Sequence, residues 1–258
     1  MSKLQRRVAI VEYIEEKGQV SFQDIKTRFP DTSDMTLRTD LKELDAQNKI
    51  IRIHGGAKSA SSVTKATDPF FKRVPLNHDK KKQIALKSAN YLNQELQRRP
   101  NLTIYLDGGS TIVEVAKMFP DEWCSIVTNC VATAYMLAPL KRPSITVLGG
   151  MLNRINCSCD SFRNTEELEH MNFDITVMPT SGYTDETDFT STKELFDEMR
   201  TVVMRRSKKL IMVMDSTKIG KVFQLTHIKK EEIDILISDD DLPDETRKVF
   251  TDLGVLVL

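Results

Sequence analysis

Apolar residues recur at helical spacing in three stretches before residue 46. The first stretch ends at Gly18, a residue that commonly closes a helix. Its apolar members are Val8, Ile10, Val11 and Ile14. The second stretch opens at Ser21, with Asp24 three residues later as in a capping box, and it stops at Pro30. Its inward residues are Phe22, Ile25 and Phe29.

The third helical stretch has an apolar face and a cationic face. Leu37, Leu41 and Leu44 fall at i, i+4 and i+7, so they share one line of the helix. Roughly 100° to 200° away from Leu37 lie Met35, Arg38, Thr39 and Lys42. The acids expected at the sides of this outward face are Asp40, Glu43 and Asp45. Such a helix either enters a DNA major groove, where Arg and Lys pair with guanine or phosphate, or is an ordinary amphipathic helix with a solvated side.

A strand and a glycine turn are predicted directly after this helix. Asn48 stands where a helix often ends in a left-handed residue. Residues 49–54 alternate enough to form a strand, and Gly55-Gly56 allows a tight hairpin turn. The basic side chains of this segment are Lys49, Arg52, His54 and Lys58. A helix-turn-helix with a two-stranded wing along the phosphates is a winged helix-turn-helix, which favours DNA binding.

A small, polar segment at residues 58–67 has the composition of a flexible linker. Residues 69–73 contain paired aromatics and are expected to dock onto the larger domain after them. A helix is predicted at 79–93, with a lysine run at its start. The predicted organisation is a DNA-binding domain at 1–57, a linker at 58–74 and a larger domain at 75–258.

Beyond residue 100, apolar β-branched runs alternate with helical patterns. Strands are predicted at residues 102–106, 125–128, 144–148, 175–178, 209–214, 233–237 and 255–258. This alternation is typical of an α/β domain with a largely parallel sheet. In such sheets, ligands bind at the carboxyl ends of the strands.

Polar loops stand at four of these strand ends. The first strand leads into Asp107-Gly-Gly-Ser-Thr111 and then an amphipathic helix. Glycines let the backbone approach an anion, and the hydroxyls and the helix N-terminus attract it, although a tight turn with Ser and Thr caps explains the same letters. The other loops are Thr128-Asn129, Gly149-Gly150 and Asp215-Ser-Thr-Lys218. Lys218 either pairs with a phosphate or is a surface lysine, and Asn129 is otherwise a turn residue.

Composition and charge limit the classes of protein to which the chain can belong. Lysine plus arginine and aspartate plus glutamate each number 37, so DNA binding must come from local geometry rather than net charge. No apolar run approaches the roughly 18 residues of a membrane span, and no apolar segment follows Met1, which predicts a cytosolic protein. The four cysteines include no CxxC pair, so neither a zinc site nor a disulfide framework is indicated, and Cys157-Ser-Cys159 favours plain thiols over a metal site.

The N-terminal part resembles the DeoR family of bacterial transcriptional regulators. The family has a recognition helix of the Ser-x-x-Thr-Ile-Arg-Arg-Asp-Leu type and an Arg-x-His-Gly-Gly-Ala wing. The matching residues are Ser33, Thr36, Leu37, Arg38, Asp40, Leu41, Arg52, His54, Gly55, Gly56 and Ala57. Thr39 stands where the family usually has a second arginine, which weakens or redirects a DNA contact, and Asn48 stands where it usually has glycine.

The rest of the chain resembles the sensor domain of the same family, which shares its fold with ribose-5-phosphate isomerase and glucosamine-6-phosphate deaminase. The matches are Phe71, Arg73, Lys81, Ile84-Ala85, Asp107, Gly109, Ser110, Thr111, Thr128-Asn129, Leu148-Gly149-Gly150, Asp215 and Lys218. The resemblance implies a phosphorylated sugar or polyol as ligand, with its phosphate on the loop 108–111. Asp160 stands where the family usually has glycine, and residues 181–200 follow the family loosely.

These patterns and the resemblance together define the expected sites. The expected DNA-binding residues are Ser33, Met35, Thr36, Arg38, Thr39, Lys42, Arg52, His54, Gly55 and Gly56. The expected effector-binding residues are Lys81, Asp107, Gly108, Gly109, Ser110, Thr111, Thr128, Asn129, Gly150 and Lys218. We expect a transcriptional regulator, most simply a repressor of a sugar or polyol catabolic operon, in which the effector shifts the arrangement of the domains. Because winged heads read half-sites in pairs, a homodimer or homotetramer joined by the C-terminal domain is expected, with no cofactor and no metal.

The alternative is a sugar-phosphate isomerase or deaminase that carries a DNA-binding head. Such an enzyme needs a carboxylate base near a strand end. The turn at residues 178–182 contains no acid, whereas the related isomerases have one there. Asp107, Asp185 and Glu186 remain as candidate bases. A magnesium ion at Asp107 would lack a second carboxylate.

Overall fold

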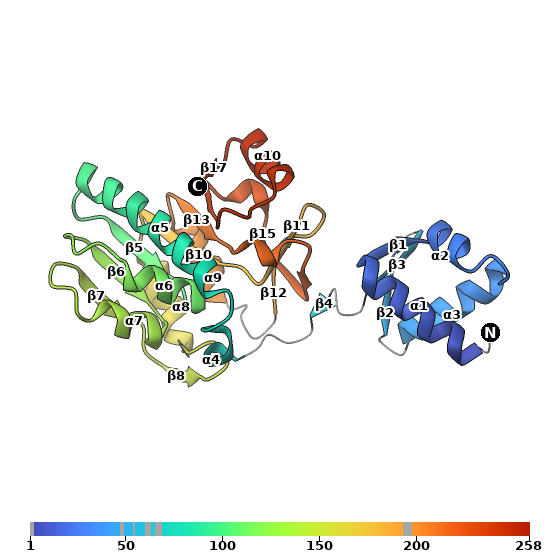
Figure 1. Ribbon diagram of the computed structural model, residues 1–258. Coiled ribbons are helices and arrows are strands. Elements are labelled where there is room, and N and C mark those ends of the chain that lie inside the picture. The colour runs from blue at the N-terminus through green and yellow to red at the C-terminus, as the bar shows by residue number, and fades with distance from the viewer. Residues whose placement is uncertain (1–2, 47–48, 54, 60–62, 65–68, 193–197) are drawn as a thin grey trace. The chain divides into compact units, whose positions relative to one another are not determined.

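The computed structural model describes residues 3–46, 49–53, 55–59, 63–64, 69–192 and 198–258. The chain forms two compact units, residues 1–65 with 221–223 and residues 66–220 with 224–258 (Figure 1). The first unit contains α1 (Lys3–Lys17), β1 (Gln19–Ser21), α2 (Phe22–Arg28), α3 (Asp34–Ala46), β2 (Ile50–Ile53), β3 (Gly56–Ser59) and β4 (Val63–Thr64). The short β4 pairs in parallel with β14 (Val222–Phe223). None of the helices among these described residues is long and apolar enough to cross a membrane.

The three predicted helices of the first unit enclose a small core. Leu37, Leu41 and Leu44 are all buried, as their spacing predicts. The core consists of Ile10, Ile14, Val20, Ile25, Phe29, Leu37, Leu41, Leu44, Ile50 and Ala57. Val8, expected on the apolar stripe of α1, is 49% exposed, so this expectation was wrong. Two residues along a helix correspond to a turn of about 200°, which takes Val8 away from the line of Ile10.

The predicted start of the second helix and the wing are also present, whereas Asn48, where the third helix was expected to end, lies outside the described residues. The side chain of Ser21 accepts a hydrogen bond from the Asp24 amide (3.1 Å), and the Asp24 carboxylate accepts one from the Ser21 amide (2.8 Å). The strands form an antiparallel sheet in the order β1-β3-β2. Gly55 has φ +78°, which suits the hairpin turn. A Cβ on Gly56 would lie 2.2 Å from the Val20 carbonyl oxygen, so the close approach of β1 and β3 requires glycine there.

All seven predicted strands of the second unit join one parallel sheet, in the order β17-β16-β13-β10-β5-β6-β7 (Figure 1). Its strands are β5 (Thr103–Leu106), β6 (Ser125–Thr128), β7 (Ser144–Val147), β10 (Ile175–Pro179), β13 (Leu210–Val213), β16 (Ile235–Ile237) and β17 (Leu256–Val257). The helices of the unit are α4 (Phe70–Arg73), α5 (His78–Arg98), α6 (Ser110–Lys117), α7 (Val131–Leu137), α8 (Phe162–Glu169), α9 (Glu198–Arg205) and α10 (Asp244–Asp252). The chain order of the strands reverses between β5 and β10, so these neighbours form a topological switch point.

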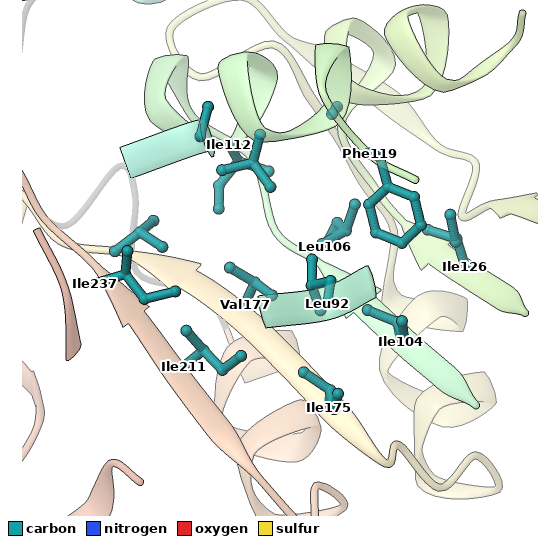
Figure 2. Close-up of a cluster of buried hydrophobic side chains, with 14 of the residues drawn as sticks. Leu92, Ile104, Leu106, Ile112, Phe119, Ile126, Ile175, Val177, Ile211 and Ile237 are labelled. Atoms are coloured by element: carbon teal, nitrogen blue, oxygen red, sulfur yellow. The ribbon is translucent and has the colours of Figure 1, made fainter. Parts of the chain in front are cut away.

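Both faces of this sheet are covered by helices. On β5, Ile104 and Leu106 enter one apolar cluster, whereas Tyr105 between them enters the other. The first cluster includes residues of α5, α6 and α7, and Figure 2 shows part of it around Leu106 and Val177. The second cluster includes residues of α8, α9 and α10. The fold is therefore a doubly wound α/β domain, which agrees with the predicted class.

Several short elements were not predicted. A second, antiparallel sheet has the order β11-β12-β15 and consists of β11 (Gly182–Thr184), β12 (Asp188–Ser191) and β15 (Leu225–Ile228). A hairpin joins β8 (Met151–Asn153) and β9 (Ser158–Asp160). Two 3-10 turns are η3 (Ser216–Lys218) and η4 (Lys230–Glu232). Of the paired aromatics, Phe70 is buried and its amide donates to the Ile155 carbonyl, whereas Phe71 is 73% exposed.

Candidate DNA-binding face and effector site

The outward face of α3 consists of exposed side chains. Met35 is 81% exposed, and Arg38, Thr39 and Lys42 are also exposed. The Thr39 hydroxyl donates to the Met35 carbonyl (2.8 Å), so that side chain turns back toward its own helix. The face therefore presents two cations and an apolar side chain that suit the edges of bases and phosphates.

Residues at the two ends of α3 hold the helix in place. The Ser33 hydroxyl accepts a hydrogen bond from the Thr36 amide (3.2 Å) and lies 2.8 Å from the Thr36 hydroxyl, which is the pattern of an N-cap. The Arg52 amide on β2 donates to the Asp45 carboxylate (3.0 Å). The exposed Arg52 side chain remains on the wing, as expected. His54 lies outside the described residues.

Asp40 is the residue of α3 that departs most from expectation. It was expected at the side of the outward face, but it is 1% exposed. Its carboxylate accepts hydrogen bonds from Nε of Arg6 and from Nε of Arg7, both at 2.7 Å. Arg7 also pairs with Glu43. Two arginines of α1 therefore make burial of this acid possible and fix α3 against α1.

The loop Asp107–Thr111 lies at the switch point of the parallel sheet. It connects β5 to α6, whose first residue is Ser110. Gly109 has φ +135°, and a Cβ there would lie 3.1 Å from Pro179 at the end of β10. A Cβ on Gly108 would lie 3.3 Å from Cys130, so both glycines sit where the backbone is closely covered. A helix N-terminus behind two glycines, at a switch point, is a geometry that can hold a phosphate.

Asp107 forms a buried ion pair that the sequence did not indicate. The Arg200 guanidinium lies 2.7 Å from the Asp107 carboxylate, and the two side chains are only 9% and 5% exposed. His227 on β15 lies nearby, and burial together with the positive charge of Arg200 lowers the pKa of its imidazole to about 3. The ring is therefore neutral at neutral pH. Arg200 belongs to the stretch that follows the family loosely, which is why no sequence signal identified it.

Lys81 lies among other charged residues near the start of α5. Its ammonium donates to the main-chain carbonyls of Arg73 and Leu76, and it is 3% exposed. Burial lowers its pKa to about 8; the charges of Lys218 and Arg73 act in the same direction, and Asp215 acts against it. Lys81 and Lys218, both expected at the effector site, are therefore electrostatically coupled. Arg73 joins them, and only the family resemblance had pointed to it.

Three further expected effector residues are hydrogen-bonded or closely packed within the protein. The Thr128 hydroxyl accepts from the Cys130 amide (3.1 Å), and Asn129 accepts from the Tyr105 hydroxyl (3.3 Å). Gly150 has φ +144°, and a Cβ there would lie 2.4 Å from the Asp160 carbonyl oxygen. These three positions therefore have structural roles whether or not they contact a ligand.

All four cysteines are free thiols, and Cys124, Cys130 and Cys159 are buried. Burial raises the pKa of Cys157 and Cys159. Within the described ranges, no three His, Cys, Asp or Glu side chains are grouped so that they could hold a metal ion.

A winged helix-turn-helix with an exposed cationic reading face, followed by an α/β domain, defines a DNA-binding transcription regulator of two domains. Residues 6–63 match the family model of the DeoR-like helix-turn-helix domain, and residues 76–240 match that of the DeoR C terminal sensor domain. The chain belongs to the DeoR family of transcriptional regulators.

Two transcription regulators resemble the chain over nearly its whole length, and one isomerase resembles it over about half. The HTH-type transcriptional regulator GolR of Listeria innocua is 26% identical over 258 residues, which cover 100% of this chain and 98% of the relative. The lactose phosphotransferase system repressor of Streptococcus mutans is 26% identical, covering 96% and 97%. Ribose 5-phosphate isomerase A of Methanocaldococcus jannaschii is similar over 55% of each chain, with 12% identity and a TM-score of 0.39. A similarity this low does not indicate the function of this chain.

Proposed function

We propose that the protein is a cytoplasmic repressor of a sugar or polyol catabolic operon and that a phosphorylated sugar releases or modulates it. The observation that carries the proposal is that one chain has both features: an exposed cationic face on α3 in the first unit and a glycine loop at the switch point in the second unit. Among the relatives are a lactose phosphotransferase system repressor and an L-fucose operon activator; both support control of a sugar operon, and repression is the sign of regulation that we propose. Residues 1–57 would bind DNA, 58–74 would link, and 75–258 would sense the effector and oligomerise.

DNA binding would use the outward face of α3 and the wing. The proposed contacts are Ser33, Met35, Thr36, Arg38, Thr39, Lys42, Arg52, His54, Gly55 and Gly56. The exposure of Met35, Arg38 and Lys42 supports their role, because base edges are reached only by side chains that project from the helix. Ser33 would act through its helix cap and, with the glycines, through backbone amides near the phosphates.

Effector binding would use the loop after β5 and the charged residues near the start of α5. The proposed contacts are Lys81, Asp107, Gly108, Gly109, Ser110, Thr111, Thr128, Asn129, Gly150 and Lys218. The charges of Lys218 and Arg73 both act on Lys81, so three cations lie near one another, and a phosphate would add to the negative charge that Asp215 supplies there.

An enzymatic role is the alternative, and the contacts of two of the three candidate bases argue against it. Asp107 is paired with Arg200, and Asp185 accepts a hydrogen bond from the Tyr183 hydroxyl (2.8 Å). A carboxylate paired with a guanidinium is a weak proton acceptor. Turnover of ribose 5-phosphate or glucosamine 6-phosphate by the purified chain would overturn the regulator-only proposal.

Two copies would pair through the edge of the parallel sheet. Strand β7 has one neighbour in that sheet, β6. Apolar side chains on β7, α7 and β8 are 42–80% exposed: Val131, Tyr135, Val147, Met151 and Leu152. Together they offer on the order of 500 Å² of apolar surface, and exposed apolar patches of this size often mark contacts between proteins. Tyr135→Asp with Met151→Asp should convert a dimer to a monomer in sedimentation; a monomeric wild type would contradict this interface.

The test of DNA recognition begins with a pool of randomised duplexes. The full chain should enrich one sequence, and Arg38→Ala should lose specific binding to it by footprinting while the far-UV spectrum stays unchanged. Arg28→Ala is the matched control, because it removes the same charge from the exposed surface of α2. Unchanged footprints with Arg38→Ala would refute the assignment of α3 as the recognition helix.

The test of effector binding is a thermal-shift screen against phosphorylated sugars and polyols. A compound that raises Tm should lose its effect in the Ser110→Ala, Thr111→Ala variant. The control is Ser125→Ala, Thr251→Ala, which removes one Ser and one Thr hydroxyl from exposed positions on β6 and α10. A shift that survives in the first variant would move the phosphate site away from residues 108–111.

A further inference from the structure

One cation of the recognition face is held against an aromatic ring. The Cζ atom of Arg38 lies 4.2 Å from the centroid of the Phe22 ring, well inside the distance of a cation–π interaction. Arg38 is exposed, whereas Phe22 is half-buried and packs against the core of the first unit. The half-buried ring therefore supports an exposed, charged side chain.

The backbone of Phe22 is itself anchored at two points. It is the first residue of α2, directly after Ser21, whose capping box with Asp24 fixes the start of that helix. Its amide donates a 2.7 Å hydrogen bond to the carbonyl of Gly55 in the turn of the wing. One residue thus touches the wing through its backbone and the recognition helix through its ring.

Stacking on a ring leaves the binding groups of an arginine free. When the planar face of a guanidinium stacks on a ring, its N–H groups point outward from its edges. Those edges form the paired hydrogen bonds to guanine or to phosphate oxygens. Because a free arginine side chain loses rotamer freedom when it binds, a support that limits this freedom beforehand strengthens binding.

We propose that Phe22 is a positioning residue, which presents the Arg38 guanidinium to duplex DNA and sets its direction relative to the wing. This inference rests on the proposed DNA-binding function of α3. It assigns a role in recognition to a residue outside the helix that enters the groove.

The first experiment compares affinities for the duplex that the wild-type chain selects from the randomised pool. Phe22→Leu should weaken binding about two- to fivefold, the range expected for an exposed cation–π contact. Phe22→Tyr keeps the ring and should retain wild-type affinity. Phe29→Leu removes the same ring from the same core, away from Arg38, and should leave the affinity of the folded protein unchanged. Equal losses in Phe22→Leu and Phe29→Leu would overturn the proposal.

A double-mutant cycle separates positioning from a general structural effect. In an Arg38→Ala background, Phe22→Leu should cause no further loss of affinity, because the side chain that it supports is absent. Additive losses would show that the ring acts independently of Arg38 and would overturn the proposal. If Arg38→Ala leaves binding unchanged, the recognition-helix assignment fails as well; if it weakens binding but Phe22→Leu does not, only the positioning role fails.

Discussion

The proposed DNA-binding face and the proposed effector site differ in burial. On α3, Met35 is 81% exposed and Arg38 stands on the surface, whereas Lys81, Asp107 and Asn129 are each at most 4% exposed. A duplex is a large, rigid partner, so the side chains that read it must project from the protein. A small ligand can be enclosed, so its site is built from residues that also hold one another. Substitutions should therefore affect binding alone in the first region, and both binding and stability in the second.

The largest expected effect tests the buried region directly. Asp107→Ala removes the carboxylate beside the Arg200 guanidinium, which is 9% exposed. Removing one partner of a buried ion pair typically costs about 3–5 kcal/mol, and urea denaturation should show this loss in the second unit. Glu169→Ala is the control, because its ion pair with Arg205 is largely exposed and should contribute about 1 kcal/mol or less. Equal losses of unfolding free energy in the two variants would contradict the idea that burial makes the Asp107–Arg200 pair more important for stability.

Asp40 is the exception within the exposed region, and it offers the next largest effect. Asp40→Ala should destabilise the first unit by about 2–4 kcal/mol, because Arg6 and Arg7 lose a buried carboxylate while staying partly solvated. Binding of the selected duplex should fall with it, since α3 loses its tie to α1. Asp34→Ala, on the same helix but 61% exposed, should change the free energy of unfolding by less than about 1 kcal/mol. An Asp40→Ala variant as stable as the wild type would show that burial of Asp40 does not contribute to the stability of the first unit.

The lowered pKa of Lys81 predicts a pH dependence of stability. Its pKa is about 8 in the fold and 10.5 when unperturbed. Between these values the unfolded chain keeps the proton and the folded chain loses it, so stability should rise with pH across this window, by at most about 1.4 kcal/mol per pH unit. Urea denaturation at pH 7.5 and 9.5 should show this rise, and Lys81→Met should lack it. An identical rise in the variant would mean that Lys81 is not the titrating group.

The smallest expected change in stability belongs to Thr39→Arg. This substitution introduces the arginine that the family resemblance implies at this position and should alter the free energy of unfolding by no more than about 0.5 kcal/mol, because Thr39 is exposed. One more phosphate contact should steepen the slope of log affinity against log salt by about 0.9. Thr39→Gln adds length without charge and should keep the wild-type slope. A salt slope that stays the same in Thr39→Arg would show that position 39 faces no phosphate.

The sequence correctly predicted the elements whose apolar side chains are buried in a hydrophobic core. Leu37, Leu41 and Leu44 and the seven β-branched strands were recognised because burial alone sets their spacing. The three-residue β1 and the sheet of β11, β12 and β15 escaped notice. These strands are only three or four residues long, which is too short for an alternation of polar and apolar residues to be distinguished from chance.

Charged partners were the part that spacing could not supply. Asp40 reads as a surface acid unless Arg6 and Arg7, 34 and 33 positions earlier, are known to reach it. Arg200 reads as a solvated helix residue unless its contact with Asp107 is known. Periodicity reports which face a residue lies on, whereas ion pairs depend on which elements meet.

The separation between the outward face of α3 and its leucines has a consequence for how such proteins diversify. Positions 35, 39 and 42 are exposed, so a change there leaves the hydrophobic core of the first unit intact. If α3 reads DNA as we propose, a gene duplicate can acquire a new target promoter by a few substitutions without losing the fold. Under the same proposal, this helix is a practical place to engineer orthogonal regulators for synthetic circuits, with Phe22 and Arg38 kept as a fixed pair.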